Sequence, residues 1–99
     1  MELSERYIAQ LEADGFSHIY EWQDAAGTVY PLHSHTGRVT LCLTDGSITL
    51  TVATTTHELV APTVFEIPAG VPHRALIGPQ GAIYIVGEEF EGDSQNINV

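Results

Sequence analysis

The sequence predicts an all-β fold, a small barrel or sandwich, with one short α-helix at its N-terminus. Short apolar and β-branched runs alternate with turns rich in glycine and proline, which is typical of β-sandwiches and β-barrels. Apolar residues at helical spacing precede these runs. We predict a single domain over residues 1–99, with the helix in 1–15, the β-barrel in 16–90 and a polar tail in 91–99.

The helix is expected over residues 3–14, where Tyr7 and Leu11 fall on the same helical face. Ser4 is a residue type that can cap the start of a helix, and Gly15 is a type that can end one. The apolar face of this helix is expected to lie against the outside of the β structure that follows.

Strands are expected where apolar and polar residues alternate between turn signals. Asp45-Gly46 is a strong signal for a two-residue hairpin turn, so we expect it to reverse the chain between two of these strands. The expected strands are Phe16–Trp22, Thr28–Leu32, Val39–Leu43, Ile48–Val52, Leu59–Val60, Val64–Ile67, Arg74–Ile77 and Ala82–Val86.

The charge balance argues against two classes of partner. Thirteen acidic residues stand against three basic ones, which gives a net charge of −10. Such a surface repels phosphate backbones and anionic lipids, so we expect no nucleic-acid partner and no membrane partner. The single cysteine, Cys42, cannot form an intramolecular disulfide, and the first residues lack the basic-then-apolar pattern of a signal peptide. We therefore expect a cytoplasmic protein.

The strongest functional signal is a pair of histidine motifs, each placed where a turn meets a strand-like run. His33 and His35 are two residues apart, so on a strand they share a face. His73 follows a proline- and glycine-rich turn, 38 residues after His35, and can supply a third imidazole from another strand. Three imidazoles suit Zn, Cu, Fe or Ni. His18 and His57 lie outside both motifs and are expected at the surface.

These motifs resemble those of the cupin superfamily, which are small β-barrels of the jelly-roll type, and the resemblance covers roughly residues 16–90. It implies a divalent metal ion (Fe, Ni, Zn or Mn) held by His33, His35 and His73, and it implies a homodimer. The positions that match the spacing of the two cupin motifs are Gly27, His33, His35, Gly46, Pro68, Gly70 and His73.

One departure from the cupin motifs is chemical, because Val39 stands where the glutamate ligand of cupins would be. Pro62 and Ile77 replace a glycine and an asparagine of the second motif. Without a carboxylate, a divalent ion keeps its full charge and favours an anionic ligand. Glu66 could replace the missing ligand but is expected to face outward, and Cys42 is expected to be a buried apolar side chain.

Three further residues are candidates for the site. Tyr30 precedes His33 by three residues and Tyr84 lies on the last strand, so either hydroxyl could orient a substrate or donate a proton near a metal. Arg38 is close to His35 in sequence and could clamp an anionic ligand at the barrel mouth. The alternatives are ordinary core or interface packing for the tyrosines and a solvated loop position for the arginine.

These observations predict a metal-binding protein with a small anionic ligand. The first hypothesis is a metal-dependent enzyme that acts on a small organic anion, dioxygenase-like or isomerase-like according to the metal. The alternative is a non-catalytic ligand-binding or sensor barrel, with or without metal. No feature of the sequence separates these hypotheses.

Overall fold

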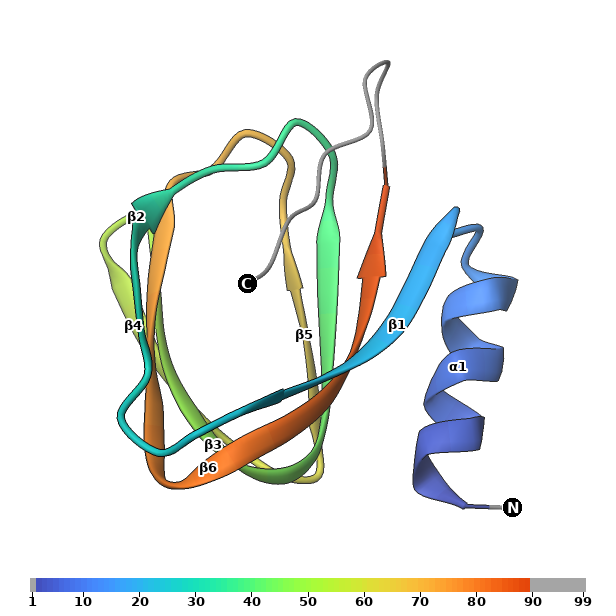
Figure 1. The fold of residues 1–99 in the computed structure, drawn as a ribbon. Helices are drawn as coiled ribbons and strands as arrows, with labels where there is room; N and C mark the ends of the chain where they lie inside the picture. The colour runs from blue at the N-terminus through green and yellow to red at the C-terminus, as the bar shows by residue number, and fades with distance from the viewer. Residues whose placement is uncertain (1, 90–99) are drawn as a thin grey trace.

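The computed structural model describes residues 2–89, and the tail predicted over residues 91–99 lies outside this range. One helix is followed by six strands that wrap around a common interior (Figure 1). The predicted all-β class with one N-terminal helix is therefore confirmed. The elements are α1 (Leu3–Ala13), β1 (His18–Asp24), β2 (Val29–His33), β3 (Val39–Val52), β4 (Thr55–Val60), β5 (Thr63–Ile67) and β6 (His73–Glu88).

Two long strands, β3 and β6, form the centre of the structure and pair with each other in antiparallel fashion along most of their length. The C-terminal half of β6 also pairs with β1, and its N-terminal half pairs with β2. In the same way, the first half of β3 pairs with β5 and the second half with β4. Because both long strands bend midway, their halves belong to opposite walls of a small barrel (Figure 1).

The bend in β3 overturns the hairpin predicted at Asp45-Gly46. β3 continues through both residues, and its register against β6 shifts between Leu43 and Asp45 and again between Gly46 and Ile48. Gly46 has a φ of 79°, and this left-handed conformation occurs in tight hairpin turns and in one class of β-bulge alike. The hairpin prediction is wrong because Asp-Gly indicates the local backbone conformation and does not show which strand pairs next.

The break expected between the strands Arg74–Ile77 and Ala82–Val86 is likewise a bend inside one strand. β6 (His73–Glu88) continues through these residues, and its ladder to β3 resumes at Ala82, opposite Gly46. Gly81 has a φ of 77° at this bend. The two central strands therefore turn the corner of the barrel together.

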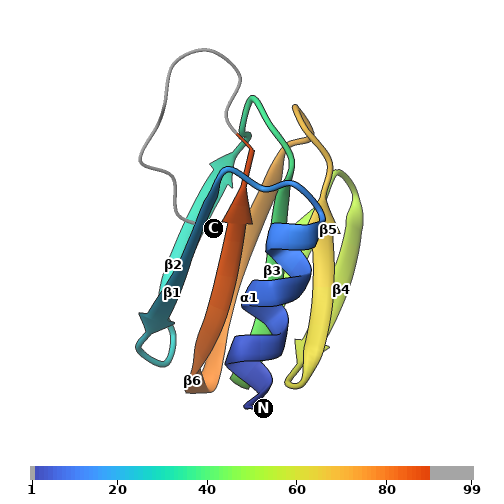
Figure 2. The ribbon, with the colours of Figure 1, turned by 90° about the vertical axis from the view of Figure 1, so that its right-hand side faces the viewer.

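Buried apolar side chains form two clusters, one on each side of the wall that contains β1 and β5. Alternate residues of β3 divide between them, because Leu41 and Leu43 point into the barrel while Cys42 points toward α1. Figure 2 shows α1 lying against the outer face of this wall. The predicted outside position of the helix and the predicted burial of Cys42 are both confirmed. The outer cluster consists of Leu11, Phe16, Cys42 and Ile85.

The ends of α1 differ in part from the prediction. The residue before the helix is Glu2, whose backbone N–H donates to the side chain of Glu5 at 3.1 Å in a capping box. Ser4 lies inside the first turn, so the prediction that it caps the helix is wrong. Gly15 follows the last turn with a φ of 86°, which confirms the predicted stop. Within residues 2–89, no helix is long and apolar enough to cross a membrane.

We predict that Gly46→Ala destabilises the fold more than Gly27→Ala. Both glycines have a φ of 79°, which costs an L-residue about 1–2 kcal/mol. A Cβ at Gly46 would overlap the carbonyl group of Gly81, whereas a Cβ at Gly27 would meet nothing within 4 Å. Chemical denaturation should show an additional loss of unfolding free energy of about 1–3 kcal/mol for Gly46→Ala. Equal losses in the two variants would contradict the close packing at the bend.

Candidate metal centre

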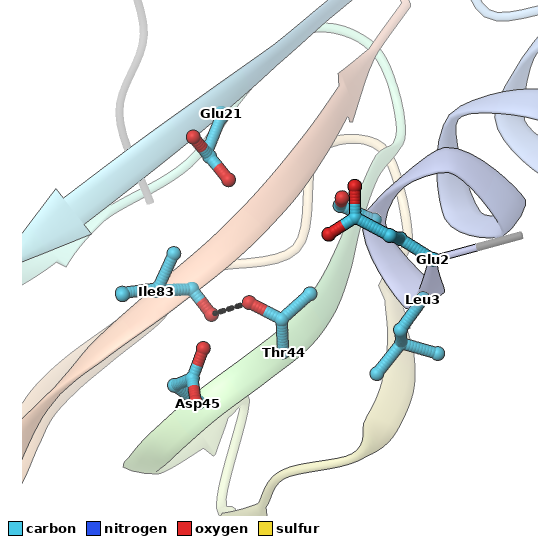
Figure 3. Close-up of a pocket in the computed structure, with 7 residues that line it drawn as sticks. Glu2, Leu3, Glu21, Thr44, Asp45 and Ile83 are labelled. Carbon is cyan, nitrogen blue, oxygen red and sulfur yellow. Dashed lines mark hydrogen bonds between the residues drawn. The ribbon is translucent and has the colours of Figure 1, made fainter.

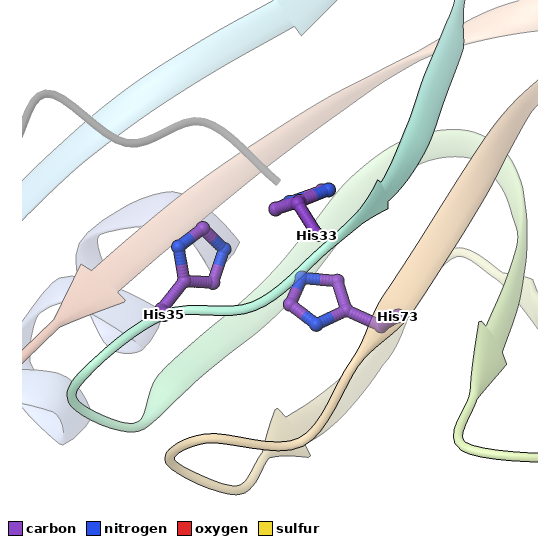
Figure 4. Close-up of side chains that lie close together, drawn as sticks. All are labelled: His33, His35 and His73. Atoms are coloured by element: carbon purple, nitrogen blue, oxygen red, sulfur yellow. The ribbon is translucent and has the colours of Figure 1, made fainter.

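Three histidine side chains meet at one end of the barrel (Figure 4). His33 ends β2 and His73 begins β6, and the two residues are paired in the antiparallel ladder. His35 lies in the segment between β2 and β3. The ring centroids of His33 and His73 are 4.3 Å apart, and the His35 centroid lies 4.9 Å from each. The ring nitrogens that could bind an ion all lie within 4.8 Å of one another.

Local backbone structure brings these rings together. The ladder between β2 and β6 changes register between Tyr30 and His33, and it ends with His33 opposite His73. The backbone N–H of Gly70 donates to the carbonyl oxygen of His35 at 2.8 Å, which ties the turn before His73 to the segment that carries His35. Gly70 has a φ of 74°, a conformation that glycine adopts without strain.

Hydrogen bonds fix the tautomer of two of the rings. Nδ1 of His33 lies 2.6 Å from the carbonyl oxygen of Pro31, and Nδ1 of His73 lies 3.1 Å from that of Val71. Because a carbonyl oxygen only accepts, each Nδ1 carries the proton and each Nε2 carries the lone pair. Nε2 of His35 and Nε2 of His73 are buried without a hydrogen-bond partner among the described residues. Buried polar atoms normally have a partner, and a bound metal ion would supply it here.

The donor set fits a divalent transition metal. Imidazole binds Zn, Fe, Ni and Cu, with a Zn–N distance of about 2.0–2.1 Å. Two nitrogens on one ion at that distance are at most about 4.2 Å apart, so small ring rotations bring this cluster into range. In the part of the chain that the structure describes, no other group of three His, Cys, Asp or Glu residues is close enough to share an ion.

Burial keeps two imidazoles of this cluster, those of His35 and His73, neutral. The pKa of His35 falls to about 4, mainly because burial penalises the charged ring and also because His73 and His33 lie close by. The pKa of His73 is lowered mainly by burial, while its hydrogen bond to Val71 acts in the opposite direction. Neutral imidazole is the form that binds metal ions, so these two rings can bind without competition from protons at neutral pH.

Val39 places an apolar side chain at the position of the cupin glutamate. Val39 is 2% exposed and belongs to the apolar interior, with Ile67 as its partner on β5 and Glu88 as its partner on β6. Glu66 is exposed and pairs with Arg38 at 3.3 Å, which confirms its predicted outward orientation. Glu66 is the only acidic residue of β5, so this strand contributes no carboxylate to the interior.

Arg38 lies on the outer side of the barrel. Its guanidinium carbon is 4.2 Å from the ring centroid of Phe16, and its nitrogens donate to Glu66, Glu89 and the carbonyl oxygen of Asp14. These contacts connect the end of α1 to β5 and to the end of β6. Binding of an anionic ligand by Arg38 stays a prediction. It would require the guanidinium group to leave these partners and bind the ligand instead.

Tyr30 and Tyr84 meet on the carboxylate of Asp24. The hydroxyl of Tyr84 donates to Oδ2 at 2.6 Å, the hydroxyl of Tyr30 donates to Oδ1 at 2.8 Å, and Nε1 of Trp22 donates to Oδ1 at 3.0 Å. Burial, followed by the hydrogen bond to Asp24, raises the pKa of both tyrosines, so both remain protonated. Their hydroxyls are engaged with Asp24, and their role beside a metal stays a prediction.

Glu88 is a buried carboxylate that the sequence analysis missed. Tyr84, Val86 and Glu88 alternate along the interior face of β6, and Glu88 is 2% exposed. Its Oε2 accepts a hydrogen bond from the hydroxyl of Tyr20 at 2.8 Å, and burial raises the pKa of its carboxyl group. The alternation of inward-facing residues could have located Glu88. It lies two residues after Val86, where the predicted strand ends, and therefore faces the same way as Tyr84 and Val86.

Two surface hollows contain none of the three histidines. One, of about 330 Å³, lies between the start of α1 and the wall beside it, and the carboxylates of Glu2, Glu21 and Asp45 line it (Figure 3). The other, of about 400 Å³, is lined by threonines of β3 and β4 together with Val29 and Leu76. The histidine cluster is therefore separate from both hollows.

Comparison with known proteins supports the fold. No family model matches the chain, and no curated protein matches it. An RmlC-like cupin from Shewanella frigidimarina has a TM-score of 0.65 and 22% identity, with 76% of this chain and 68% of that chain covered. KdgF from Halomonas sp. has a TM-score of 0.62 and 16% identity, with 76% of this chain and 70% of the KdgF chain covered. The oxalate decarboxylase of Bacillus subtilis has a TM-score of 0.70 and 19% identity, covering 80% of this chain and 22% of that one. The chain therefore has the cupin fold.

We predict that His35 titrates well below the usual range in the metal-free protein. Its pKa of about 4 in the folded state compares with 6.5 in the unfolded chain. The stability contributed by neutral His35 is therefore complete above pH 6.5 and is lost as the pH falls toward 4, because only the unfolded chain binds the proton there. An NMR titration of the ring carbons should give a midpoint for His35 near pH 4. A midpoint near 6.5 would contradict the burial of this ring.

Proposed function

We propose that this chain binds one divalent transition-metal ion on His33, His35 and His73, and that the ion holds a small anionic organic ligand. The observation that carries the proposal is the convergence of three imidazoles, two of which present a buried Nε2 atom without a partner. Fe, Ni and Zn are candidate ions because imidazole nitrogen suits them. Mn is a candidate because an oxalate decarboxylase of the same fold is described as having Mn(II) centres.

Electrostatics favours an anion as the ligand of this centre. Neutral imidazoles leave the charge of a divalent ion in place, and the chain as a whole carries a net charge of −10. A metal centre would thus be an isolated positive site in an acidic protein. When bound, such an ion polarises a ligand oxygen as a Lewis acid.

Proteins of the same fold support the proposal at the level of class. The structurally similar oxalate decarboxylase is described as having Mn(II) centres. Another structural neighbour is described as a DMSP lyase, DddQ. Metal binding and the conversion of small organic molecules therefore occur with this fold. We carry over this class of function to the present chain and not the individual substrates.

The enzyme hypothesis is a dioxygenase-like or isomerase-like reaction on a small organic anion. Proton transfer in such a reaction requires an acid or base beside the ligand. The tyrosines that the sequence offers for this role, Tyr30 and Tyr84, donate their hydroxyls to Asp24. This observation favours a second candidate function, a non-catalytic ligand-binding or sensor barrel in which the metal holds the ligand.

We also propose a homodimer formed through the outer face of the wall that contains β2. Val29 and Leu76 are ladder partners on this face and are 65% and 47% exposed, and they border the hollow of about 400 Å³. A second copy of the chain would remove this apolar surface from water. A cytoplasmic location stays a prediction from the sequence.

The metal content of the purified protein tests the proposed function. After reconstitution, elemental mass spectrometry should find about one divalent ion per chain in the wild type and little in His73→Ala, because two histidines alone make a weaker site. His57→Ala is the matched control, since His57 lies on β4 in ring contact with Phe65, outside the cluster. The ion should also raise the melting temperature of the wild type and of the control.

Two outcomes would contradict this proposal. The first is a wild-type protein that binds none of Fe, Mn, Ni or Zn after reconstitution. The second is equal metal binding by the wild type, His57→Ala and His73→Ala, which would place the bound ions outside the three-histidine cluster.

A further inference from the structure

Glu88 places a carboxylate inside the barrel, and among residues 2–89 no lysine or arginine forms an ion pair with it. It is 2% exposed and shares the interior face of β6 with Tyr84 and Val86. The neighbour across the ladder on β3 is Val39, an apolar residue. The hydrogen bond from Tyr20 at 2.8 Å satisfies one oxygen but brings no charge.

The three basic residues of the chain do not compensate this carboxylate. Arg38 forms ion pairs with acidic residues on the outer side of the barrel, and Arg6 and Arg74 are exposed. His18, the ladder partner of Glu88 on β1, acts electrostatically in favour of the charged carboxylate, but its side chain is exposed and burial remains the larger influence on the pKa of Glu88, which is raised. A buried carboxylate whose one basic neighbour is an exposed histidine is costly to keep charged, so a cation inside the barrel would stabilise it.

Glu88 lies at the same end of the barrel as the histidine cluster. The end of β6, the start of β6 and the end of β2 are at one end of the molecule in Figure 1. The segment that carries His35 leads into β3 and is held against β6, because the N–H of Glu89 donates to the carbonyl oxygen of Arg38 at 3.1 Å. Val39 and Glu88 are directly opposite in the ladder, so both side chains occupy the interior face at this end.

We propose that Glu88 is the negatively charged group of the metal centre, and that its carboxylate compensates the ion held by His33, His35 and His73. This inference rests on the proposed metal binding. Neutral imidazoles leave the charge of the ion in place, and Glu88 brings an opposite charge that no lysine or arginine among the described residues pairs with. Each charge reduces the cost of burying the other. Tyr20 holds the carboxylate through its hydroxyl group.

The class of ligand follows from this charge balance. One carboxylate against a divalent ion leaves a single positive charge at the centre. A singly charged organic anion, such as a monocarboxylate or an enolate, neutralises it. A dianion would leave an excess negative charge inside the barrel, so the centre favours monoanions.

The direct test is the affinity for Zn²⁺, measured by competition with a chromophoric chelator. Zn²⁺ is a suitable probe because three imidazoles bind it whichever ion the cell supplies. Glu88→Gln keeps the size of the side chain and removes its charge, and we expect it to weaken Zn²⁺ binding about 10–100-fold. Glu89→Gln is the matched control, because it removes the same charge one residue further on, from a side chain that pairs with Arg38 on the outer side. This control should stay within about threefold of the wild type.

Thermal unfolding with and without Zn²⁺ separates a metal-linked role from a purely structural one. Without metal, Glu88→Gln should raise the melting temperature, because it removes the cost of burying a charged carboxylate. With saturating Zn²⁺, the rise in melting temperature caused by the metal should be smaller in Glu88→Gln than in the wild type. A residue with a structural role alone would change both melting temperatures by the same amount. If Glu88→Gln does not fold, Glu88→Met provides the same test, because methionine is apolar and of similar length.

The position of the charge can be tested by moving it across the ladder. Val39→Glu combined with Glu88→Gln transfers the carboxylate to the directly opposite residue on the same interior face. This double variant should recover Zn²⁺ affinity to within about threefold of the wild type if a carboxylate on this face compensates the ion. Because residue 39 is also the position of the glutamate ligand in the cupin motifs, Glu88→Gln alone remains the direct test of Glu88.

The outcomes distinguish this inference from the proposed function. If the wild type and Glu88→Gln bind Zn²⁺ equally while His73→Ala does not, the metal site stands and the role of Glu88 is wrong. If the wild type binds no metal, both proposals fail. A folded double variant that binds as weakly as Glu88→Gln would also overturn the charge-compensating role of Glu88.

Discussion

The antiparallel pairing of β3 with β6 is the constraint on which both the barrel and the candidate metal centre depend. The two strands belong to both walls, and their common bend, at Gly46 in β3 and at residues 78–81 in β6, turns the sheet back on itself. Because β6 runs away from the histidine end and returns to it, its first residue is His73 and its last is Glu88. One bent strand therefore contributes an imidazole and a buried carboxylate to the same end of the barrel.

The chemistry of the centre follows from the burial that this architecture imposes. Removing the imidazoles from water lowers the pKa of His35 and His73, and their buried Nε2 atoms have no hydrogen-bond partner among the described residues. Backbone carbonyls orient the rings of His33 and His73 from the opposite nitrogen. A cation is the species that gives these lone pairs a partner and lowers the cost of the buried Glu88. Arg38 pairs with Glu66 and Glu89 on the outer side of the barrel.

The sequence predicted the fold class, the helix and the grouping of the three histidines, because these depend on local patterns. Alternation showed which face of a strand is apolar, and the spacing of His33 and His35 limited where their rings could point. The hairpin at Asp45-Gly46 failed because a glycine with positive φ serves a turn and a bulge alike, and only long-range pairing distinguishes them. The role of Glu88 depends on its register opposite Val39, which a single sequence does not reveal.

The most direct test of the metal centre is an NMR measurement of the imidazole nitrogens of ¹⁵N-labelled protein during a titration with Zn²⁺. The account predicts that the Nε2 signals of His33, His35 and His73 shift together and saturate at about one ion per chain, while Nδ1 of His33 and His73 keeps its proton. His18 and His57 should not follow this transition. A titration in which the three Nε2 signals do not move, or in which all five histidines respond in parallel, would contradict a metal site at this cluster.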